Sequence, residues 1–140
     1  AANDGAAMKG SLRCSVNDLL TFSSPFMDHF FLCRIRDLYR AILNFEQYFE
    51  QHYDLNLNEA MLLCTLSARS SQTAGEVAEA LGLTNSNASK VIASAEALKL
   101  IKRQMCKDDK RRMRFSLTAL GEERLARLQA DDIEVPEILR

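Results

Sequence analysis

The middle of the sequence changes from a helical to a strand-like pattern, and this change constrains the fold more than any other feature. Thr73 and Glu76 have the spacing of a capping box, and Gly82 is typical of the end of the short helix that would follow. Thr84 can cap a further helix that reaches about Leu98. Two short helices joined by a glycine-containing turn are typical of a helix-turn-helix.

Two strand-like segments follow these helices. Residues 101–106 and 112–117 are separated by a charged turn, and residues 112–117 alternate between polar and apolar side chains, which predicts an antiparallel hairpin. Met113, Phe115 and Leu117 are expected to point to the core. The predicted fold class is therefore mainly α, with an α+β winged helix-turn-helix domain whose wing has two strands.

Two further helices are predicted before the helix-turn-helix. Apolar residues recur at threes and fours from Ser24 to Tyr53, and so broad an aromatic stripe favours burial against more than its own domain. Asn56 and Glu59 predict a capping box for the next helix. On each of the three capped helices, some residues are expected to face inward. They are Ala60, Met61, Leu63, Cys64 and Leu66 on the helix that Asn56 caps, Val77, Ala80 and Leu81 on the helix that Thr73 caps, and Ala88, Val91, Ile92, Ala95 and Leu98 on the helix that Thr84 caps.

Charge is segregated along the chain, although the 140 residues have a formal net charge of only -1. From Asn85 to Arg114, nine cations oppose three carboxylates, which gives +6 there and leaves -7 for the rest. A module of this kind can carry a basic face without a basic isoelectric point. A wing that binds a protein partner would need no such excess, and this adaptor function is the alternative from another class.

Small polar side chains cluster at the start of the helix that Thr84 would cap. Amides and hydroxyls there can hydrogen-bond base edges and phosphates, and Lys90 can reach a phosphate or a guanine. The alternative is an ordinary solvated face, because small polar residues are also common near helix caps. The residues predicted to contact DNA on this helix are Thr84, Asn85, Ser86, Asn87, Ser89 and Lys90.

The turn between the predicted strands combines carboxylates with cations. Asp109 and Arg111 can form a surface ion pair that contributes about 0 to 1 kcal/mol. A further use is orientation, because arginine suits a narrow minor groove and a neighbouring carboxylate can hold its side chain in one direction. Lys110 and Arg112 are predicted to contact phosphates, so the DNA-binding set of the wing is Asp109, Lys110, Arg111 and Arg112.

These residues resemble the multiple antibiotic resistance regulator (MarR) family of winged-helix transcription factors. The run LGLTNSNASKVIASAEALKLIKRQMCKDDKRRMRFSLTALGEE is similar to that family's recognition helix, strand, wing tip, second strand and following Leu-Thr-x-x-Gly, and the similarity extends from about Leu55 to Glu123. The matching residues are Asp109, Lys110 and Arg111 in the wing, then Leu117, Thr118 and Gly121.

The resemblance implies a cytoplasmic, ligand-responsive repressor that binds a pseudo-palindromic operator in double-stranded DNA as a homodimer. Recognition helices would enter successive major grooves and wing arginines the flanking minor grooves, while a small-molecule effector would bind between the dimer helices and the winged domain. The family often has an acidic-basic pair late in the recognition helix and Lys-Gly before the strand. This chain has Ala93 and Ser94 at the first place and Leu98 and Lys99 at the second. Some phosphate contacts are therefore expected to be missing.

The predicted domain organisation follows from the patterns and the resemblance together. Residues 1–23 form a flexible N-terminal segment, and residues 24–54 form the N-terminal dimerisation helix. Residues 55–118 form the winged helix-turn-helix DNA-binding domain, and residues 119–140 form a C-terminal helix, which also dimerises, and a tail.

Other function classes receive little support from the sequence. His29 and His52 join no catalytic arrangement, no CxxC spacing indicates a metal, and no glycine-rich loop would hold a phosphate cofactor. No enzyme, metal or cofactor is therefore expected. There is also no signal for export or a membrane span, so a cytoplasmic location without a membrane partner is expected.

The cysteines leave one alternative open, a redox-sensing regulator. Cys33 and Cys64 lie among apolar residues and are interpreted as small core fillers. Cys106 stands beside Lys107, which can favour its thiolate. Cys14 lies in the predicted flexible segment. The sequence alone does not decide which of the four cysteines, if any, is redox-active.

Overall fold

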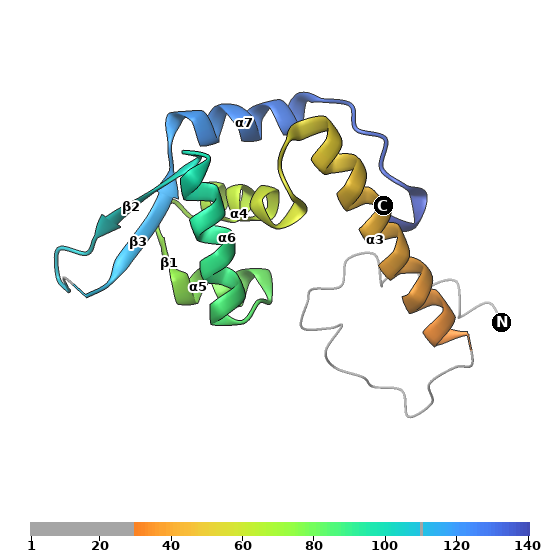
Figure 1. Cartoon of the computed structure of the whole chain (residues 1–140), viewed down its shortest axis with the longest axis horizontal. Helices are drawn as coiled ribbons and strands as arrows, with labels where there is room; N and C mark the ends of the chain where they lie inside the picture. Colours follow the sequence, from red (N-terminus) through yellow and green to blue (C-terminus); the bar gives the residue numbers. More distant parts are fainter. Residues whose placement is uncertain (1–29, 110) are drawn as a thin grey trace, which may run out of the picture. The chain divides into compact units, whose positions relative to one another are not determined.

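The computed structural model describes residues 30–109 and 111–140 of the chain (Figure 1). The internal contacts of the chain group it into two compact units that meet after Asp37. The larger unit, from Leu38 to Arg140, contains the helix-turn-helix and the wing. The elements are α3 (Phe31–Tyr53), α4 (Leu57–Ala68), β1 (Gln72–Thr73), α5 (Ala74–Leu81), α6 (Asn85–Ala97), β2 (Ile101–Met105), β3 (Met113–Leu117), α7 (Ala119–Ala130) and a 3-10 turn, η1 (Glu137–Leu139).

The order of the elements confirms the predicted winged helix. The long first helix is present from Phe31 onward, and the part of its prediction that begins at Ser24 lies outside the described residues, as do His29 and Cys14. The helix-turn-helix is formed by α5 and α6, and both strands of the wing follow within one residue of their predicted bounds.

The sheet has three antiparallel strands in the order β1-β3-β2. The hairpin pairs Ile101 with Leu117 and Met105 with Met113, so the predicted inward-facing positions of β3 share one face. The strand β1 pairs Gln72 with Phe115 and was not predicted. Figure 1 shows the β2-β3 ribbon extending away from the helices of its unit as the wing.

Side-chain caps fix where the helices begin. The capping box of α4 is complete, because Asn56 Oδ1 accepts from the Glu59 amide at 2.7 Å and Glu59 Oε1 accepts from the Asn56 amide at 3.1 Å. Thr73 caps α5, and Thr84 caps α6 by accepting from the Asn87 amide at 3.1 Å. The caps read from the sequence are therefore confirmed as helix starts, although the reciprocal bond expected from Glu76 is not part of the α5 cap.

The core lies between α4, α6 and the sheet, with contributions from α3 and α7. Its buried apolar members are Phe49, Leu55, Leu62, Leu63, Leu66, Val77, Val91, Ile92, Ala95, Leu100, Ile101, Phe115 and Leu125. The prediction for the buried face of α4 was wrong at Met61 and Cys64, which are exposed. Residues 60 to 64 are all apolar, so periodicity alone could not determine which side of α4 faces inward.

Two other predicted core positions are corrected by the structure. Ala80 of α5 is exposed, and Ala78 beside Val77 is buried in its place. Leu98 caps the end of α6 and is 40% exposed, because the chain leaves the helix there toward the buried Leu100.

The Leu-Thr-x-x-Gly motif joins the start of α7 to the start of β2. Thr118 Oγ1 donates to the Lys99 carbonyl at 2.7 Å and accepts from the Gly121 amide at 3.0 Å. The Thr118 amide donates to the Leu100 carbonyl at 3.0 Å. A Cβ at Gly121 would lie 2.1 Å from that Leu100 oxygen, so the glycine permits a close backbone approach. The motif is structural here.

Candidate nucleic-acid interface

The helix α6 has one buried face and one open polar face. Ala88, Val91 and Ile92 are buried, whereas the polar residues predicted to contact DNA are exposed. The Thr84 hydroxyl is used in the helix cap. Within the described ranges, no hydrogen bond or ion pair occupies the side chains of the other predicted residues, which are Asn85, Ser86, Asn87, Ser89 and Lys90.

This open face coincides with the N-terminal turns of α6. Backbone N–H groups at a helix N-terminus lack intrahelical partners, and the helix dipole favours negative charge there. Amide and hydroxyl side chains with free hydrogen-bonding capacity therefore surround a position that favours an anion such as a phosphate. Base edges and phosphates are both chemically suited to this surface.

The wing tip is organised by a backbone contact of Asp109. Its Oδ1 accepts from the Arg111 amide at 2.9 Å, and the Arg112 amide donates to the Asp109 carbonyl at 3.0 Å. Cys106 closes the hairpin by donating its amide to the Arg112 carbonyl at 2.9 Å. No ion pair between Asp109 and the Arg111 guanidinium is found among the described residues. The carboxylate thus orients Arg111 through its backbone, which corrects the expected side-chain contact.

The exposed cations of the tip stand on this turn. Arg111 and Arg112 are exposed, whereas Lys110 lies outside the described residues. In Figure 1 the turn between β2 and β3 and the N-terminal end of α6 both lie toward the lower side of the winged-helix unit. The backbone segments that carry the described residues of the predicted DNA-binding set therefore lie on the same side of this unit in that view.

Arg103 has an internal role that the sequence did not reveal. Its Nε donates to Glu96 Oε2 at 2.9 Å, its Nη2 contacts Glu96 Oε1, and its guanidinium lies 5.6 Å from the centre of the Phe115 ring. The hydrogen bond and charge of Glu96 raise the pKa of Arg103. A bidentate pair of this kind fixes β2 to the last turn of α6.

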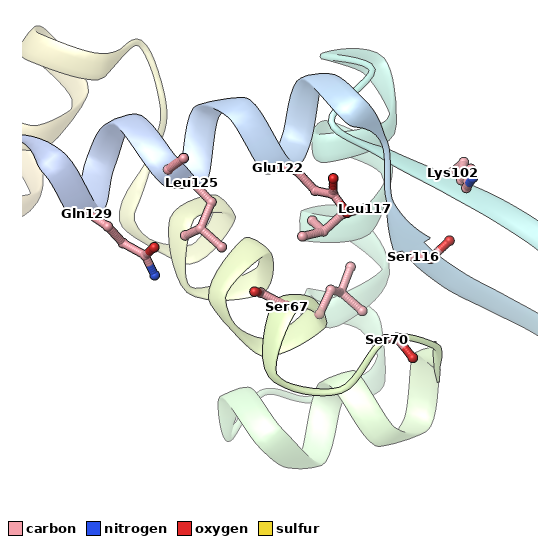
Figure 2. Close-up of a pocket in the computed structure, with 10 residues that line it drawn as sticks. Ser67, Ser70, Lys102, Ser116, Leu117, Glu122, Leu125 and Gln129 are labelled. Carbon is pink, nitrogen blue, oxygen red and sulfur yellow. The ribbon is translucent and has the colours of Figure 1, made fainter.

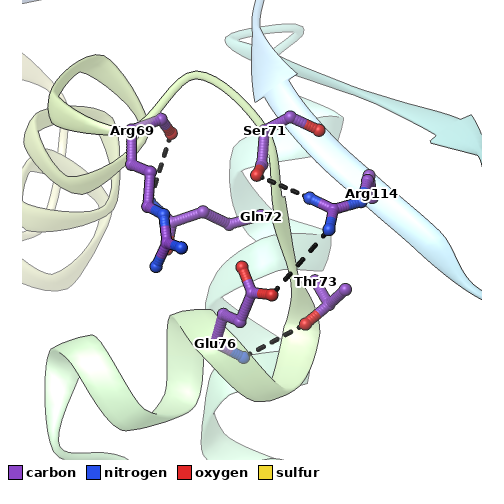
Figure 3. A network of polar contacts seen from close by, with 6 residues as sticks. All are labelled: Arg69, Ser71, Gln72, Thr73, Glu76 and Arg114. Carbon is purple, nitrogen blue, oxygen red and sulfur yellow. Dashed lines mark hydrogen bonds and ion pairs between the residues drawn. The ribbon is translucent and has the colours of Figure 1, made fainter.

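Arg114 is also used inside the domain, as Figure 3 shows. Its Nη1 donates to the Ser71 carbonyl at 2.8 Å, and its Nη2 lies 3.9 Å from Glu76 Oε1. Gln72 is 3% exposed and caps the end of α4 by donating to the carbonyls of Thr65 and Arg69, at 2.9 and 3.2 Å. Arg103 and Arg114 are therefore structural members of the nine-cation segment.

Glu59 is a buried carboxylate that contacts α6. It is 5% exposed, and its Oε2 accepts from Ser94 Oγ at 3.1 Å. Ser94 stands at one of the positions where the sequence departs from the family pattern. Its hydroxyl is bound to the neighbouring helix α4.

The cysteines and the outer face of α3 complete the description of the surface. Cys33 and Cys64 are exposed, so their interpretation as core fillers was wrong, and Cys106 is half-buried. Apolar side chains on α3 are also exposed, namely Tyr39 (63%), Ile42 (38%), Leu43 (43%) and Tyr48 (37%). Ile42 and Leu43 follow Tyr39 by three and four residues, so these three side chains share one face of α3, whereas Tyr48 lies on the other side of the helix. The apolar row formed by Tyr39, Ile42 and Leu43 indicates an interaction surface.

A cavity of about 390 Å³ lies beside the wing base, between the end of α4 and α7 (Figure 2). It combines leucine side chains with three serines, a cation and an anion, so it suits a small ligand that is partly apolar and partly polar. The lining residues are Leu66, Ser67, Ser70, Lys102, Ser116, Leu117, Glu122, Leu125, Ala126 and Gln129.

Neither a metal centre nor a membrane span is evident in the described ranges. Their His, Cys, Asp and Glu side chains form no group of three or more that could hold a metal ion. None of their helices is long and apolar enough to cross a membrane.

A model of the MarR family matches residues 53–112, which span α4 to the wing tip. The winged-helix segment is therefore similar to the MarR family. A search of curated proteins gave no match. Among solved structures, the MarR-family regulator AbsC of Streptomyces coelicolor is similar at 22% identity and a TM-score of 0.64, over 76% of this chain and 75% of that one.

Two further structural relatives contain DNA. A MarR variant from Escherichia coli, complexed with operator DNA, has 15% identity and a TM-score of 0.62, over 72% of this chain and 76% of that one. A Staphylococcus aureus MepR variant bound to an oligodeoxyribonucleotide has 24% identity and a TM-score of 0.57, over 75% and 76%. At these identities the likeness shows that this chain shares their fold.

Proposed function

We propose that the protein is a sequence-specific DNA-binding transcriptional regulator that acts as a homodimeric repressor. The observation that carries this proposal is the open polar face of α6, where the exposed side chains of residues 85–87, 89 and 90 make no hydrogen bond or ion pair within the described residues, together with an exposed cationic wing tip in the same unit. The family match and the DNA complexes of two structural relatives support it.

The proposed binding mode uses α6 for base recognition and the wing for the flanking groove. The first turns of α6 would enter the major groove, where Asn87 and Lys90 can bond base edges or phosphates. Arg111 would enter the minor groove, because its guanidinium is weakly hydrated and its backbone is held by Asp109 at 2.9 Å. Arg112 would contact a phosphate.

The exposed apolar row of α3 supports the homodimer. Tyr39, Ile42 and Leu43 are more than a third exposed in the single chain, which is costly for apolar side chains unless a partner covers them. A second copy related by two-fold symmetry would bring identical rows together. Such a dimer would present two recognition helices to half-sites about one helical turn apart.

The cavity beside the wing base supports response to a small-molecule ligand. Its volume of about 390 Å³ is within the range of small-molecule sites. Lys102 lies on β2 and Glu122 on α7, so a ligand that bridged them would restrain the wing relative to α7. One structural relative is BpsR of Bordetella bronchiseptica, whose DNA binding is regulated by 6-hydroxynicotinic acid.

Selection of bound duplexes from a random DNA pool tests the proposed function. The expected result is enrichment of one sequence with two inverted half-sites whose centres are about 10 base pairs apart. A pool that remains random after repeated rounds, under salt conditions in which other DNA-binding proteins select their sites, would refute sequence-specific binding.

A further inference from the structure

We propose that Glu59 is a positioning residue for DNA recognition, and that its hydrogen bond to Ser94 sets α6 relative to the junction that follows α3. This inference rests on the proposed function above. It gives a role to a buried carboxylate and to a recognition-helix serine, neither of which belongs to the predicted DNA-contacting surface.

Both oxygens of the Glu59 carboxylate are engaged. Oε1 accepts from the Asn56 amide at 3.1 Å, and Oε2 accepts from Ser94 Oγ at 3.1 Å. The residue is only 5% exposed. A buried carboxylate is costly unless it is hydrogen-bonded, so removal of the Ser94 hydroxyl would leave one oxygen without its partner. The bond therefore restrains α6 more strongly than an exposed polar contact would.

The position of Ser94 on α6 makes this restraint relevant to recognition. Ser94 follows Lys90 by four residues and Asn87 by seven, so the three side chains lie along nearly the same side of the helix. A rotation of α6 about its axis that breaks the Ser94 bond would therefore also move Lys90 and Asn87. The Ser94 bond fixes the angle at which these two residues meet a groove.

The contacts on either side of Ser94 extend the restraint in two directions. Asn56 begins α4 three residues after the end of α3, beside Leu55, which is 2% exposed. Glu96, in the same turn of α6 as Ser94, holds Arg103 of β2. Polar contacts thus join the α3-α4 junction, the recognition helix and the wing strand. We infer that they keep α6 and the wing in register.

A purely local role in capping α4 is the competing explanation, and the chain offers a matched control for it. Asn56 Oδ1 accepts from the Glu59 amide at 2.7 Å, and no hydrogen bond joins its side chain to α6 within the described residues, so Asn56→Ala weakens the cap but leaves the Glu59 carboxylate bound to Ser94. Ser94→Ala removes the bond to α6 and leaves the cap intact. Ser94→Thr keeps a hydroxyl at the same position.

The experiment compares these variants of the full chain on the duplex selected for the wild type and on an unrelated duplex of equal length. All measurements are made at a temperature at which denaturant unfolding shows each variant to be folded. Ser94→Ala should lower the preference for the selected duplex between about twofold and thirtyfold. Its salt dependence should equal that of the wild type, because no phosphate contact is removed. Ser94→Thr should restore the preference, and Asn56→Ala should leave it unchanged.

Glu59→Gln tests the same bond from its other partner, because the amide keeps the length of the side chain but loses the charge. It should lower the preference in the same direction, and the double variant with Ser94→Ala should lose no more than Ser94→Ala alone. Equal loss in Ser94→Ala and Asn56→Ala, or full preference in Ser94→Ala, would overturn the inference. A wild-type protein that prefers no duplex would instead refute the proposed function itself.

Discussion

Asp109 should support DNA binding through the shape of the wing turn and not through its charge. Its Oδ1 accepts the Arg111 amide at 2.9 Å, and it makes no ion pair with that guanidinium among the described residues. Asp109→Asn keeps an oxygen that can accept the same bond, whereas Asp109→Ala removes it. Both variants delete one negative charge, so the difference between them isolates the hydrogen bond.

The size of the effect follows from one bond in each wing. A net hydrogen bond contributes about 0.5 to 1.5 kcal/mol, and an exposed turn belongs in the lower part of that range, about 0.5 to 1 kcal/mol. A dimer has two wings far enough apart for their losses to add, which gives about 1 to 2 kcal/mol for the whole complex. Asp109→Ala should therefore bind the selected duplex about five to thirty times more weakly than Asp109→Asn.

Equilibrium titration of a labelled duplex by fluorescence anisotropy measures this difference. On unrelated DNA the two variants should bind alike, because they carry the same charge. Equal affinities of Asp109→Ala and Asp109→Asn for the selected duplex would show that the turn does not hold Arg111 for DNA. A loss in both variants relative to the wild type would assign the effect to the charge of the carboxylate.

Three further predictions concern stability and assembly. Gly121→Ala should destabilise the protein by about 3 kcal/mol or more in urea unfolding, because its Cβ would lie 2.1 Å from a backbone oxygen, and a loss below about 1 kcal/mol would contradict the close approach. Lys99 has a φ of 60°, which is strained for a lysine and not for a glycine. Lys99→Gly should therefore raise the free energy of unfolding by about 0.5 to 1 kcal/mol, even though glycine has the greater entropy in the unfolded chain, and a lower free energy of unfolding would show that the lysine is not strained. Ile42→Glu should convert a dimer to a monomer in sedimentation at micromolar concentration, whereas Met61→Glu, at a similar exposure of 40% against 38%, should not, and the opposite pattern would place the interface on α4.

The caps, the hairpin and the helix-turn-helix could be predicted because they depend on short-range signals. Asn56, Thr73 and Thr84 begin helices because their side chains accept backbone amides within three residues. Gly82 ends α5 with a φ of 65°, a conformation that glycine adopts without strain. The alternation of β3 likewise placed Phe115 in the core.

The remaining features depend on contacts between residues that are not neighbours in the sequence, and the spacing of residues along the chain does not predict such contacts. Strand β1 is two residues long and exists because Gln72 pairs with Phe115, far along the chain. Arg103 was predicted only as part of a basic segment, but its pair with Glu96 requires the wing strand to lie beside α6. The bond between Glu59 and Ser94 joins residues 35 positions apart, so it became visible only when α4 and α6 were packed together.

The most direct test of the central claim is the affinity of the full chain for its selected duplex and for an unrelated duplex across a range of salt concentrations. If a dimer presents Lys90, Arg111 and Arg112 twice, its six cations should displace counterions from about six phosphates, so binding should be roughly a thousandfold weaker at 200 mM than at 50 mM salt. The selected duplex should stay preferred by about a thousandfold or more at physiological salt. Binding that is weak, insensitive to salt and equal on both duplexes would contradict the account and favour a wing that binds a protein partner.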